Sequence, residues 1–389
     1  MVYLDTSKTD DPENTIIQIL QNNGIDYLGT LPCDRIKNLL PLISRNFVEI
    51  PLTREENGVG ICAGLYMAGA KPMMVIQSSG LGNMINALES LNIACHIPLP
   101  IIASWRGVYK EGIEAQKPLG KALPSILEGA GIKYTIIDET GKLYLLGQAI
   151  SDSFETRSPH IILISPKVWE PSTCSVWSEQ ESVSFKKRSY EIIHKTRIFK
   201  PEMKRYDAIY AVSPLLNNEI LVANIGIPCK ELYSIRDRGL NYYMLGSLGL
   251  ASSIGMGLAL KSGRKVVVLD GDGSILMNPN ALLEIARANP SNLIVIALDN
   301  GAHGSTGSQE TFTAQFLDLE ILAQAFGFVN TTKVHTKKEL EEAFINAKNA
   351  GGLTFIHVIL KPGNVTCENI ALSPVELTDR FMNALKLKN

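Results

Sequence analysis

Strand and helix signals alternate along almost the whole chain, and this alternation constrains the fold more than any other feature. Short runs rich in Val, Ile and Leu, such as 72–77 (PMMVIQ) and 292–298 (NLIVIAL), stand between amphipathic segments such as 16–24 (IIQILQNNG). Continuous apolar strands that alternate with helices are typical of parallel strands covered by helices on both faces. The sequence therefore predicts an α/β fold built from doubly wound parallel sheets.

The alternation lapses once, between Pro166 and about Lys200, where the chain is polar, Ser-rich and weakly periodic. The 389 residues suffice for two domains, each with a substantial core. We therefore expect a first domain over 1–166, a linker over 167–200 and a second domain over 201–389. In open sheets of this kind ligands bind beyond the carboxyl ends of the strands, so functional residues are expected in the loops that follow the strands.

Composition excludes several classes of partner. A net charge of -2 argues against a nucleic acid or a membrane surface recognised by bulk charge. No apolar run approaches the ~20 residues of a membrane span, and the polar, acidic start MVYLDTSKTDDPEN is unlike a signal peptide. The six cysteines are scattered without a CxxC pair, as in reduced cytosolic proteins. We expect a cytoplasmic protein.

The segment VVVLDGDGSILMN (266–278) ends a buried strand in two carboxylates, Asp270 and Asp272. Buried carboxylates are costly to desolvate unless a cation compensates them. An EF-hand loop does not fit, because its sixth and twelfth positions hold Ile275 and Ala281. A P-loop does not fit either, because no GK[ST] follows. A structural turn and a site for another cation remain open.

The next strand supports the cation site, because it ends at Asn300. Adjacent parallel strands place Asp272 and Asn300 side by side, and the backbone carbonyl near Ala302 can supply a third oxygen. Such a set suits Mg²⁺, which takes few protein oxygens and completes its octahedron with phosphate and water. Gly271 and Gly273 let the backbone approach a phosphate, which the following helix N-terminus favours.

Here the sequence resembles the thiamine diphosphate enzymes, whose motif is GDG followed some two dozen residues later by Asn-Asn. The chain has Asp299 at the first Asn. The family's metal ligand is the second, which matches Asn300, so this departure leaves metal binding intact. The resemblance implies two cofactors, thiamine diphosphate and Mg²⁺. The implied residues are Gly271, Asp272, Gly273, Ser274 and Asn300 for the cofactor, and Asp272, Asn300 and Ala302 for the metal.

Two further elements of the family have counterparts here. A buried carboxylate that bonds the aminopyrimidine ring precedes a small-residue helix, and TREENGVGICAGLYMAGAK (53–71) has this form. Its register points to Glu56 rather than Glu55, although both acids also suit a helix N-terminus through the dipole. A Gly-Ser-hydrophobic-Gly turn, which holds the cofactor bent, matches Gly246, Ser247 and Leu248.

The resemblance covers nearly the whole chain. The chain is most similar to the compact two-domain enzymes of this family, which include sulfopyruvate and phosphonopyruvate decarboxylases. The two halves resemble pyrimidine-binding and diphosphate-binding domains, like separate α and β parts fused end to end. The stretches SSGLGN (78–83) and SWRG (104–107) carry this part of the likeness.

An anionic 2-oxoacid substrate agrees with the charged and polar residues of the first half. An Arg presents two donors in one plane, which suits a sulfonate. The expected substrate contacts are Arg106, Ser78, Ser79, Asn83 and Lys117, with a solvated surface charge as the alternative for the lysine. His303, next to the metal loop, is expected to relay a proton, with a structural role equally open.

The implied reaction is the Mg²⁺- and thiamine diphosphate-dependent decarboxylation of 3-sulfopyruvate to sulfoacetaldehyde in coenzyme M biosynthesis. Decarboxylation of phosphonopyruvate is the first alternative, and a carboligating synthase of the acetohydroxyacid type is the second. A non-catalytic cofactor-binding subunit is a third, disfavoured by the presence of Glu56 and the metal ligands. The resemblance also implies a homodimer or a higher homo-oligomer with sites between subunits.

Overall fold

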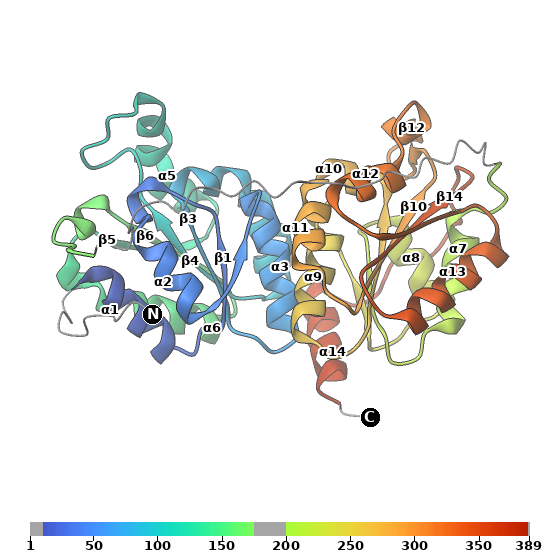
Figure 1. Cartoon of the computed structure of the whole chain (residues 1–389), viewed down its shortest axis with the longest axis horizontal. Coiled ribbons are helices and arrows are strands. Elements are labelled where there is room, and N and C mark those ends of the chain that lie inside the picture. The colour runs from blue at the N-terminus through green and yellow to red at the C-terminus, as the bar shows by residue number, and fades with distance from the viewer. Residues whose placement is uncertain (1–10, 175–199, 388–389) are drawn as a thin grey trace. The chain divides into compact units, whose positions relative to one another are not determined.

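The chain forms two α/β units in a computed structural model that describes residues 11–174 and 200–387 (Figure 1). Contacts between residues divide the chain into two compact units, and residues 63–69 group with the second unit. Each unit contains one six-stranded parallel sheet, so the predicted fold class is confirmed. Most of the predicted linker over 167–200 lies outside the described residues.

The sheet of the first unit has the strand order β2-β1-β3-β4-β6-β5, and all its pairs are parallel. Its strands are β1 (Tyr27–Thr30), β2 (Val48–Pro51), β3 (Pro72–Gln77), β4 (Leu99–Ser104), β5 (Lys133–Ile137) and β6 (Pro159–Ile164). Its α-helices are α1 (Pro12–Asn22), α2 (Leu39–Asn46), α3 (Glu55–Met67), α4 (Ile85–Ala87), α5 (Lys117–Gly129) and α6 (Tyr144–Thr156). Short 3₁₀ turns follow several strands, among them η1 (Asp34–Ile36), η2 (Ser78–Asn83), η4 (Glu114–Gln116), η5 (Thr140–Lys142) and η6 (Pro166–Trp169).

Helices cover both faces of this sheet because alternate side chains of each strand point to opposite sides. On one face Met73 and Val75 join a core with α1, α2 and α6. On the other face Met74 meets α3, where a Cβ on Gly58 would lie 2.5 Å from the Met74 methyl carbon. Strands buried on both faces explain the unbroken apolar runs in the sequence.

The second unit repeats this plan with the strand order β13-β14-β10-β9-β7-β8. Its strands are β7 (Ile220–Ala223), β8 (Asn241–Tyr243), β9 (Val266–Gly271), β10 (Leu293–Asp299), β13 (Asn330–Val334) and β14 (Thr354–Ile359), with a separate hairpin of β11 (Ala302–His303) and β12 (Gln309–Glu310). Its helices are α7 (Arg205–Val212), α8 (Ile227–Ile235), α9 (Ala251–Lys261), α10 (Asp272–Met277), α11 (Asn280–Ala288), α12 (Leu319–Phe326), α13 (Lys337–Ala350) and α14 (Pro374–Lys386), with 3₁₀ turns at η7 (Ser213–Leu215) and η8 (Phe312–Ala314).

The core of the second unit follows the same alternation. Val267 and Leu269 pack with α7, α8 and α13 on one face. Val268 faces α9 on the other side, where a Cβ on Gly255 would lie 2.2 Å from a Val268 methyl carbon. Close approach of α9 to the sheet therefore requires the glycine, which explains the small-residue character of that helix.

The chain reverses its direction of travel across each sheet at one place. In the second sheet, β8 lies on one side of β7 and β9 on the other. The loops after β7 and β9 therefore leave the sheet side by side, at the kind of crevice where open α/β sheets bind ligands. In the first sheet the same reversal falls between β1 and β3, with β2 outside β1.

Three elements are not marked by a clear signal in the sequence. The apolar segment over 83–93 forms only the short helix α4, followed by the π-helical segment η3 (Leu88–Ile93). Strands β8 and β13 were not expected, because the first has three residues and the second, Asn-Thr-Thr-Lys-Val, is largely polar and lies at the sheet edge. Neither strand carries the apolar run that marks a central strand.

Candidate functional site

Asp272 lies at the centre of the polar loops of the second unit, where β9 passes into α10. It is buried, and its Oδ2 accepts hydrogen bonds from the hydroxyls of Thr311 at 2.5 Å and Thr313 at 3.2 Å. Burial, together with the nearby charge of Asp299, raises the pKa of the Asp272 carboxyl. A carboxylate in this position gains from a bound cation, which would offset both effects.

Asn300 follows the neighbouring strand β10, as the sequence predicted, and it is buried beside the same pocket. Its Oδ1 accepts the Ala302 backbone amide at 3.2 Å, while its Nδ2 has no hydrogen-bond partner among the residues that the structure describes. A carboxylate, a side-chain amide and a backbone carbonyl are oxygen donors of the kind that Mg²⁺ prefers. The residues at this edge therefore fit a Mg²⁺ site, and the unpaired Nδ2 of Asn300 is a donor that could bond an anion beside the metal.

The pocket beside Asp272 lies at the reversal point of the second sheet. Its lining residues are Arg205, Asn224, Ile225, Ile227, Pro228, Leu248, Gly271, Asp272, Gly273, Ser274, Leu298, Asn300, Ala302, His303, Gly304 and Ser305. A Cβ on Gly273 would lie 2.6 Å from Cε1 of His303. A side chain at 273 would have to displace this ring, so Gly273 lets the ring lie close to the loop.

The predicted turn at Gly246, Ser247 and Leu248 lies next to the GDG loop. Ser247 has a positive φ of 57°, and Leu248 lines the pocket. The backbone amide of Gly249 donates to Oγ of Ser274 at 3.2 Å. The structure thus brings the turn and the GDG loop together around one pocket, although they lie some 25 residues apart in the sequence.

Asp272 lines the pocket, whereas Asp270 is not among its lining residues. Its Oδ1 accepts the backbone amide of Gly271 at 3.0 Å, and its Oδ2 accepts the Ser252 hydroxyl at 2.7 Å. Asp270 therefore bonds to the backbone of its own turn. Burial raises the pKa of this carboxyl, while the hydrogen bonds from these neighbours act against the shift.

Asp299, which replaces the first Asn of the family motif, has its own buried partner. Its Oδ2 lies 2.7 Å from Nε2 of His357, and the other ring nitrogen lies 3.6 Å from Asp318. Burial alone would lower the pKa of His357, but the hydrogen bond to Asp299 and the nearby carboxylate of Asp318 outweigh it and raise the pKa. His357 thus balances the additional charge that Asp299 brings next to the GDG loop.

In the first unit, the acid that the structure buries at the start of α3 is Glu55. Glu55 is 8% exposed, and its Oε2 accepts the Asn83 side-chain amide at 3.1 Å. Glu56 instead pairs with the half-exposed Arg54 at 3.0 Å, and its own side chain is 18% exposed. A Cβ on Gly80 would lie 2.1 Å from Oε1 of Glu55, so this loop glycine makes room for the acid. Within the single chain Glu55 is thus the more buried of the two acids, and the expected role of Glu56 at the cofactor stays a prediction.

Arg106 is held by side chains of its own unit rather than left open to a ligand. Its Nε and Nη2 donate to the two oxygens of Glu111 at 2.7 and 2.9 Å, and its Nη1 donates to Asp34 at 2.6 Å and Gln77 at 3.2 Å. The hydrogen bonds from Arg106 hold the pKa of the Glu111 carboxyl at about 2. Two carboxylates thus already share the charge of Arg106, and its expected contact with the substrate stays a prediction.

The loop after β3 carries three of the expected substrate residues, and each already has a partner. Ser78 accepts the Arg106 backbone amide at 2.9 Å, Ser79 accepts the Gln77 side-chain amide, and Asn83 donates to Glu55. These residues, with Arg106 after β4, gather at the carboxyl edge of the first sheet. The sequence placed these residues in loops that follow strands, as the structure does. It did not predict the hydrogen bonds between them.

Lys117 stands apart from that group, because its Nζ pairs with Glu114, whose side chain is 84% exposed. This is the solvated surface charge that the sequence left open as an alternative. A hollow of about 710 Å³ lies near the same sheet edge and includes Asp34 in its wall. Its lining residues are Thr30, Pro32, Cys33, Asp34, Lys37, Leu40, Pro41, Ser44, Arg45, Glu49 and Pro51.

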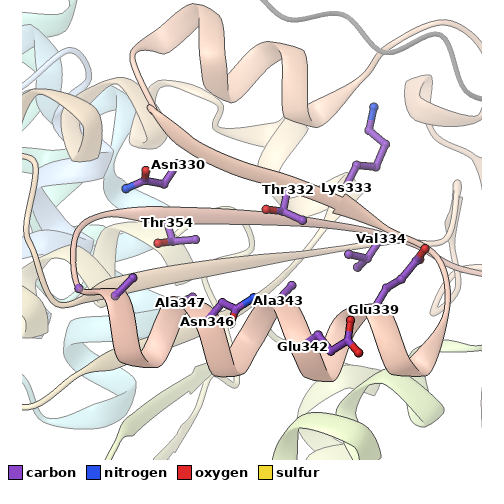
Figure 2. A pocket seen from close by; sticks show the side chains of 12 residues that line it. Asn330, Thr332, Lys333, Val334, Glu339, Glu342, Ala343, Asn346, Ala347 and Thr354 are labelled. Carbon is purple, nitrogen blue, oxygen red and sulfur yellow. The ribbon is translucent and has the colours of Figure 1, made fainter.

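A second hollow of the second unit, of about 640 Å³, runs along the edge strand β13 and helix α13 (Figure 2). It is lined by Asn330, Thr332, Lys333, Val334, Glu339, Glu342, Ala343, Asn346, Ala347, Ala350, Gly351 and Thr354. None of the predicted site residues lies in it. No group of three or more His, Cys, Asp or Glu side chains within the described stretches is arranged to hold a metal ion.

Several residues of the site gave no signal in the sequence. Thr311 and Thr313, which orient Asp272, lie in an irregular stretch after the β11–β12 hairpin. Arg205 follows directly on the polar stretch around Lys200 and gave no sign of reaching the pocket. Each of these residues reaches the site through the tertiary fold. No helix in the described parts of the chain is long and apolar enough to cross a membrane.

Two protein families match the chain, one in each unit. Residues 12–125 match the thiamine pyrophosphate enzyme N-terminal TPP binding domain, and residues 226–358 match the C-terminal TPP binding domain of the same enzymes. A putative thiamin diphosphate-dependent enzyme from Mycobacterium smegmatis has the same fold, with a TM-score of 0.68 and 13% identity over 91% of this chain and 100% of that one.

The chain is also similar in sequence to proteins of known name. Sulfopyruvate decarboxylase from Methanosarcina acetivorans is 62% identical over 97% of this chain and 98% of its own. Sulfopyruvate decarboxylase subunit beta from Methanocaldococcus jannaschii is 48% identical over 47% of this chain and 97% of its own, and subunit alpha from the same organism is 39% identical over 40% and 94%. Phosphonopyruvate decarboxylase from Streptomyces viridochromogenes is 30% identical over 92% of this chain and 91% of its own.

Proposed function

The chain belongs to the sulfopyruvate decarboxylase family of thiamine pyrophosphate enzymes, and from this premise we propose that it converts 3-sulfopyruvate to sulfoacetaldehyde and CO₂. It is a carboxy-lyase that depends on thiamine pyrophosphate, also called thiamine diphosphate. The observation that carries the substrate is the 62% identity to a sulfopyruvate decarboxylase along 97% of the chain. The product would serve coenzyme M biosynthesis.

For the metal, we propose Mg²⁺ held by Asp272, Asn300 and the backbone carbonyl of Ala302. Support comes from the buried carboxylate of Asp272, whose pKa burial raises, and from the buried side chain of Asn300 beside it, whose Oδ1 is an oxygen donor. Gly271 and Gly273 would let the diphosphate approach the backbone, with Ser274 behind them. The turn at Gly246, Ser247 and Leu248 would hold the rest of the cofactor.

For the acid that bonds the aminopyrimidine ring, the geometry favours Glu55 over the expected Glu56. Such a carboxylate must be shielded from water to share a proton with the ring. Glu55 is buried and held by Asn83, whereas Glu56 pairs with a half-exposed arginine. We therefore propose Glu55 for this role and retain Glu56 as the alternative.

For the substrate, we propose contacts from Ser78, Ser79, Asn83 and Arg106, with Lys117 as an outlying charge. Arg106 and Glu111 form a buried pair in which the arginine donates to both carboxylate oxygens. The second carboxylate that pairs with Arg106, that of Asp34, is 63% exposed. A sulfonate would reach Nη1 of Arg106 by displacing Asp34, while Glu111 keeps the guanidinium in place.

When bound, the thiazolium ring of the cofactor accepts the electron pair that the departing CO₂ leaves behind. The residues of the chain would orient the substrate and transfer the protons. Glu55 would hold a proton at the pyrimidine ring, and the arginine would orient the anionic head group. His303, whose ring lies against Gly273, would return a proton to the product carbon.

A homodimer or a higher homo-oligomer is also proposed, with sites that two copies complete. Relatives carry the two halves as separate subunits named alpha and beta, and this chain joins both halves in one. The proposal is checked by the mass of the cofactor-loaded protein in solution, where a monomer with full activity would contradict it.

One assay tests the substrate. CO₂ release is measured without oxygen from sulfopyruvate, phosphonopyruvate and pyruvate in parallel, with Mg²⁺ and thiamine diphosphate present. We expect the highest kcat/KM with sulfopyruvate. A higher value with phosphonopyruvate would favour the second candidate, to which the chain is related at 30% identity. Preference for pyruvate, or formation of a carboligation product, would contradict both readings.

A further inference from the structure

Arg205 is a buried cation of the second unit to which the sequence assigned no role. It is the first residue of α7 and is 6% exposed. Its Nε donates to Oε2 of Glu231 at 2.8 Å, and its Nη2 donates to Oε1 of Glu231 at 3.1 Å and to Asn364 at 2.8 Å. This two-point pairing fixes the plane of the guanidinium.

The supporting residues are themselves held in place. Glu231, on α8, is fully buried, and its Oε1 also accepts the backbone amide of Val365 at 3.3 Å. The side-chain amide of Asn364 donates to the carbonyl of Gly304 at 2.7 Å, in the loop that follows His303. Arg205 is therefore tied to the same loop that forms one wall of the pocket at Asp272.

One nitrogen of Arg205 remains available for a ligand. Nη1 makes no hydrogen bond to any residue in the described part of the chain, although the other two nitrogens make three. Arg205 lines the pocket that also contains Asp272, Asn300 and the two glycines of GDG. A guanidinium that lines a pocket, with its plane fixed and one nitrogen without a partner among the described residues, is well placed to bind an anion at little cost in side-chain entropy.

We propose that Arg205 is a further ligand of the cofactor's diphosphate, to which Nη1 donates. The inference rests on the proposed function, because it takes the pocket at Asp272 as the diphosphate site. The diphosphate carries more negative charge than one Mg²⁺ neutralises, so a second cation at the pocket wall complements the metal. Glu231 balances Arg205 when the pocket holds no anion, which makes the buried cation tolerable in the free protein.

The test measures binding of thiamine diphosphate, with Mg²⁺ present, to cofactor-free protein by calorimetry. Arg205→Gln is expected to raise the Kd of thiamine diphosphate by about tenfold to a hundredfold, the usual range for a hydrogen bond to a charged group. Binding of thiamine, which has no diphosphate, should change much less. Arg205→Lys keeps the charge but loses the fixed plane, and an intermediate Kd is expected.

A paired variant separates ligand binding from folding. Arg205→Gln leaves Glu231 buried without its partner, which destabilises proteins strongly. Arg205→Gln/Glu231→Gln removes both charges, so its thermal unfolding without cofactor should recover toward that of the unaltered protein. The weak binding of thiamine diphosphate should persist in this double variant. If the double variant regains normal affinity, Arg205 is only structural and the proposal is wrong.

Two further outcomes are decisive. A raised KM for the 2-oxoacid with an unchanged Kd for thiamine diphosphate would assign Arg205 to the substrate and overturn the proposal. If the unaltered protein binds thiamine diphosphate but decarboxylates none of the tested oxoacids, the proposed function fails. The inference on Arg205 would stand in that case, since its readout is binding.

Discussion

The carboxylate of Glu55 and the side-chain amide of Asn83 are joined by a hydrogen bond of 3.1 Å, across 28 positions of sequence. This bond ties the start of α3 to the loop after β3, where Gly80 leaves space for the acid. Of the two adjacent glutamates, only Glu55 contacts this loop, because Glu56 pairs with Arg54. Neighbouring residues on a helix point about 100° apart, so only one of the pair can face this loop.

Exchange of each glutamate for glutamine tests this selection. Glu55→Gln should lower kcat by about a hundredfold or more, because a general acid–base group contributes on that scale. Glu56→Gln serves as the matched control and should keep most of the activity. Binding of thiamine diphosphate should remain measurable in both variants. The reverse order, with Glu56→Gln the inactive variant, would restore the assignment that the sequence favoured.

Replacement of Asp272 should weaken metal binding. Asp272→Ala removes the carboxylate that we assign to Mg²⁺, and the apparent Mg²⁺ affinity in the presence of thiamine diphosphate should fall at least about tenfold. Thermal unfolding followed during Mg²⁺ titration reports this change without an activity assay. Chelation by EDTA should reproduce the loss in the unaltered protein. If Mg²⁺ affinity is unchanged in the variant, the metal lies elsewhere.

The exposed partner of Arg106 should control the affinity for an anionic head group. Asp34→Asn removes the carboxylate that competes for Nη1, so the KM for sulfopyruvate should fall about twofold to fivefold, the range of an exposed ion pair. The KM for pyruvate, which lacks the second anionic group, should not change. Asp138→Asn, at another exposed acid paired with a lysine, is the control. Equal changes for both substrates would separate Arg106 from the head group.

The buried pair of Arg106 and Glu111 should make the free energy of unfolding depend on pH in the acid range. The hydrogen bonds from Arg106 lower the pKa of the Glu111 carboxyl from 4.5 to about 2. A carboxyl with a lowered pKa stabilises the fold fully above pH 4.5, and this contribution is lost as the pH falls toward 2. Glu111→Gln should therefore destabilise the protein at pH 7 and progressively less at pH 4 and 3.

Urea unfolding at these three pH values measures the effect. Glu114→Gln is the control, because the side chain of Glu114 is 84% exposed and its pair with Lys117 is solvated. A difference in unfolding free energy that stays the same at all three pH values would show that Glu111 stabilises the fold by packing rather than by its charge.

The parts of the site that lie on regular strands were predictable from the sequence. Strands β9 and β10 carry unbroken apolar runs, so the residues that end them, Asp272 and Asn300, were expected side by side. Which of Glu55 and Glu56 is buried was not predictable, because it depends on how α3 is rotated about its axis against the elements that it packs on. Spacing along the chain alone could not settle that rotation.

Partnerships across long stretches of sequence were also beyond prediction. Arg205 meets Asn364, which is 159 positions away, and Arg106 meets Asp34 across 72 positions. A charged residue in the sequence shows neither whether it is buried nor which acid neutralises it. The pairing of Arg106 with Glu111 and Asp34 and the pairing of Arg205 with Glu231 were both missed for this reason.

The buried pair of Asp299 and His357 has a consequence for how this family can diverge. A carboxylate in place of the motif's first asparagine adds a charge next to the metal loop, and the histidine on the adjacent strand β14 compensates it. Neither residue can be exchanged alone without leaving its partner buried and uncompensated. The two positions should therefore change together among relatives, as a coupled substitution rather than as two independent ones.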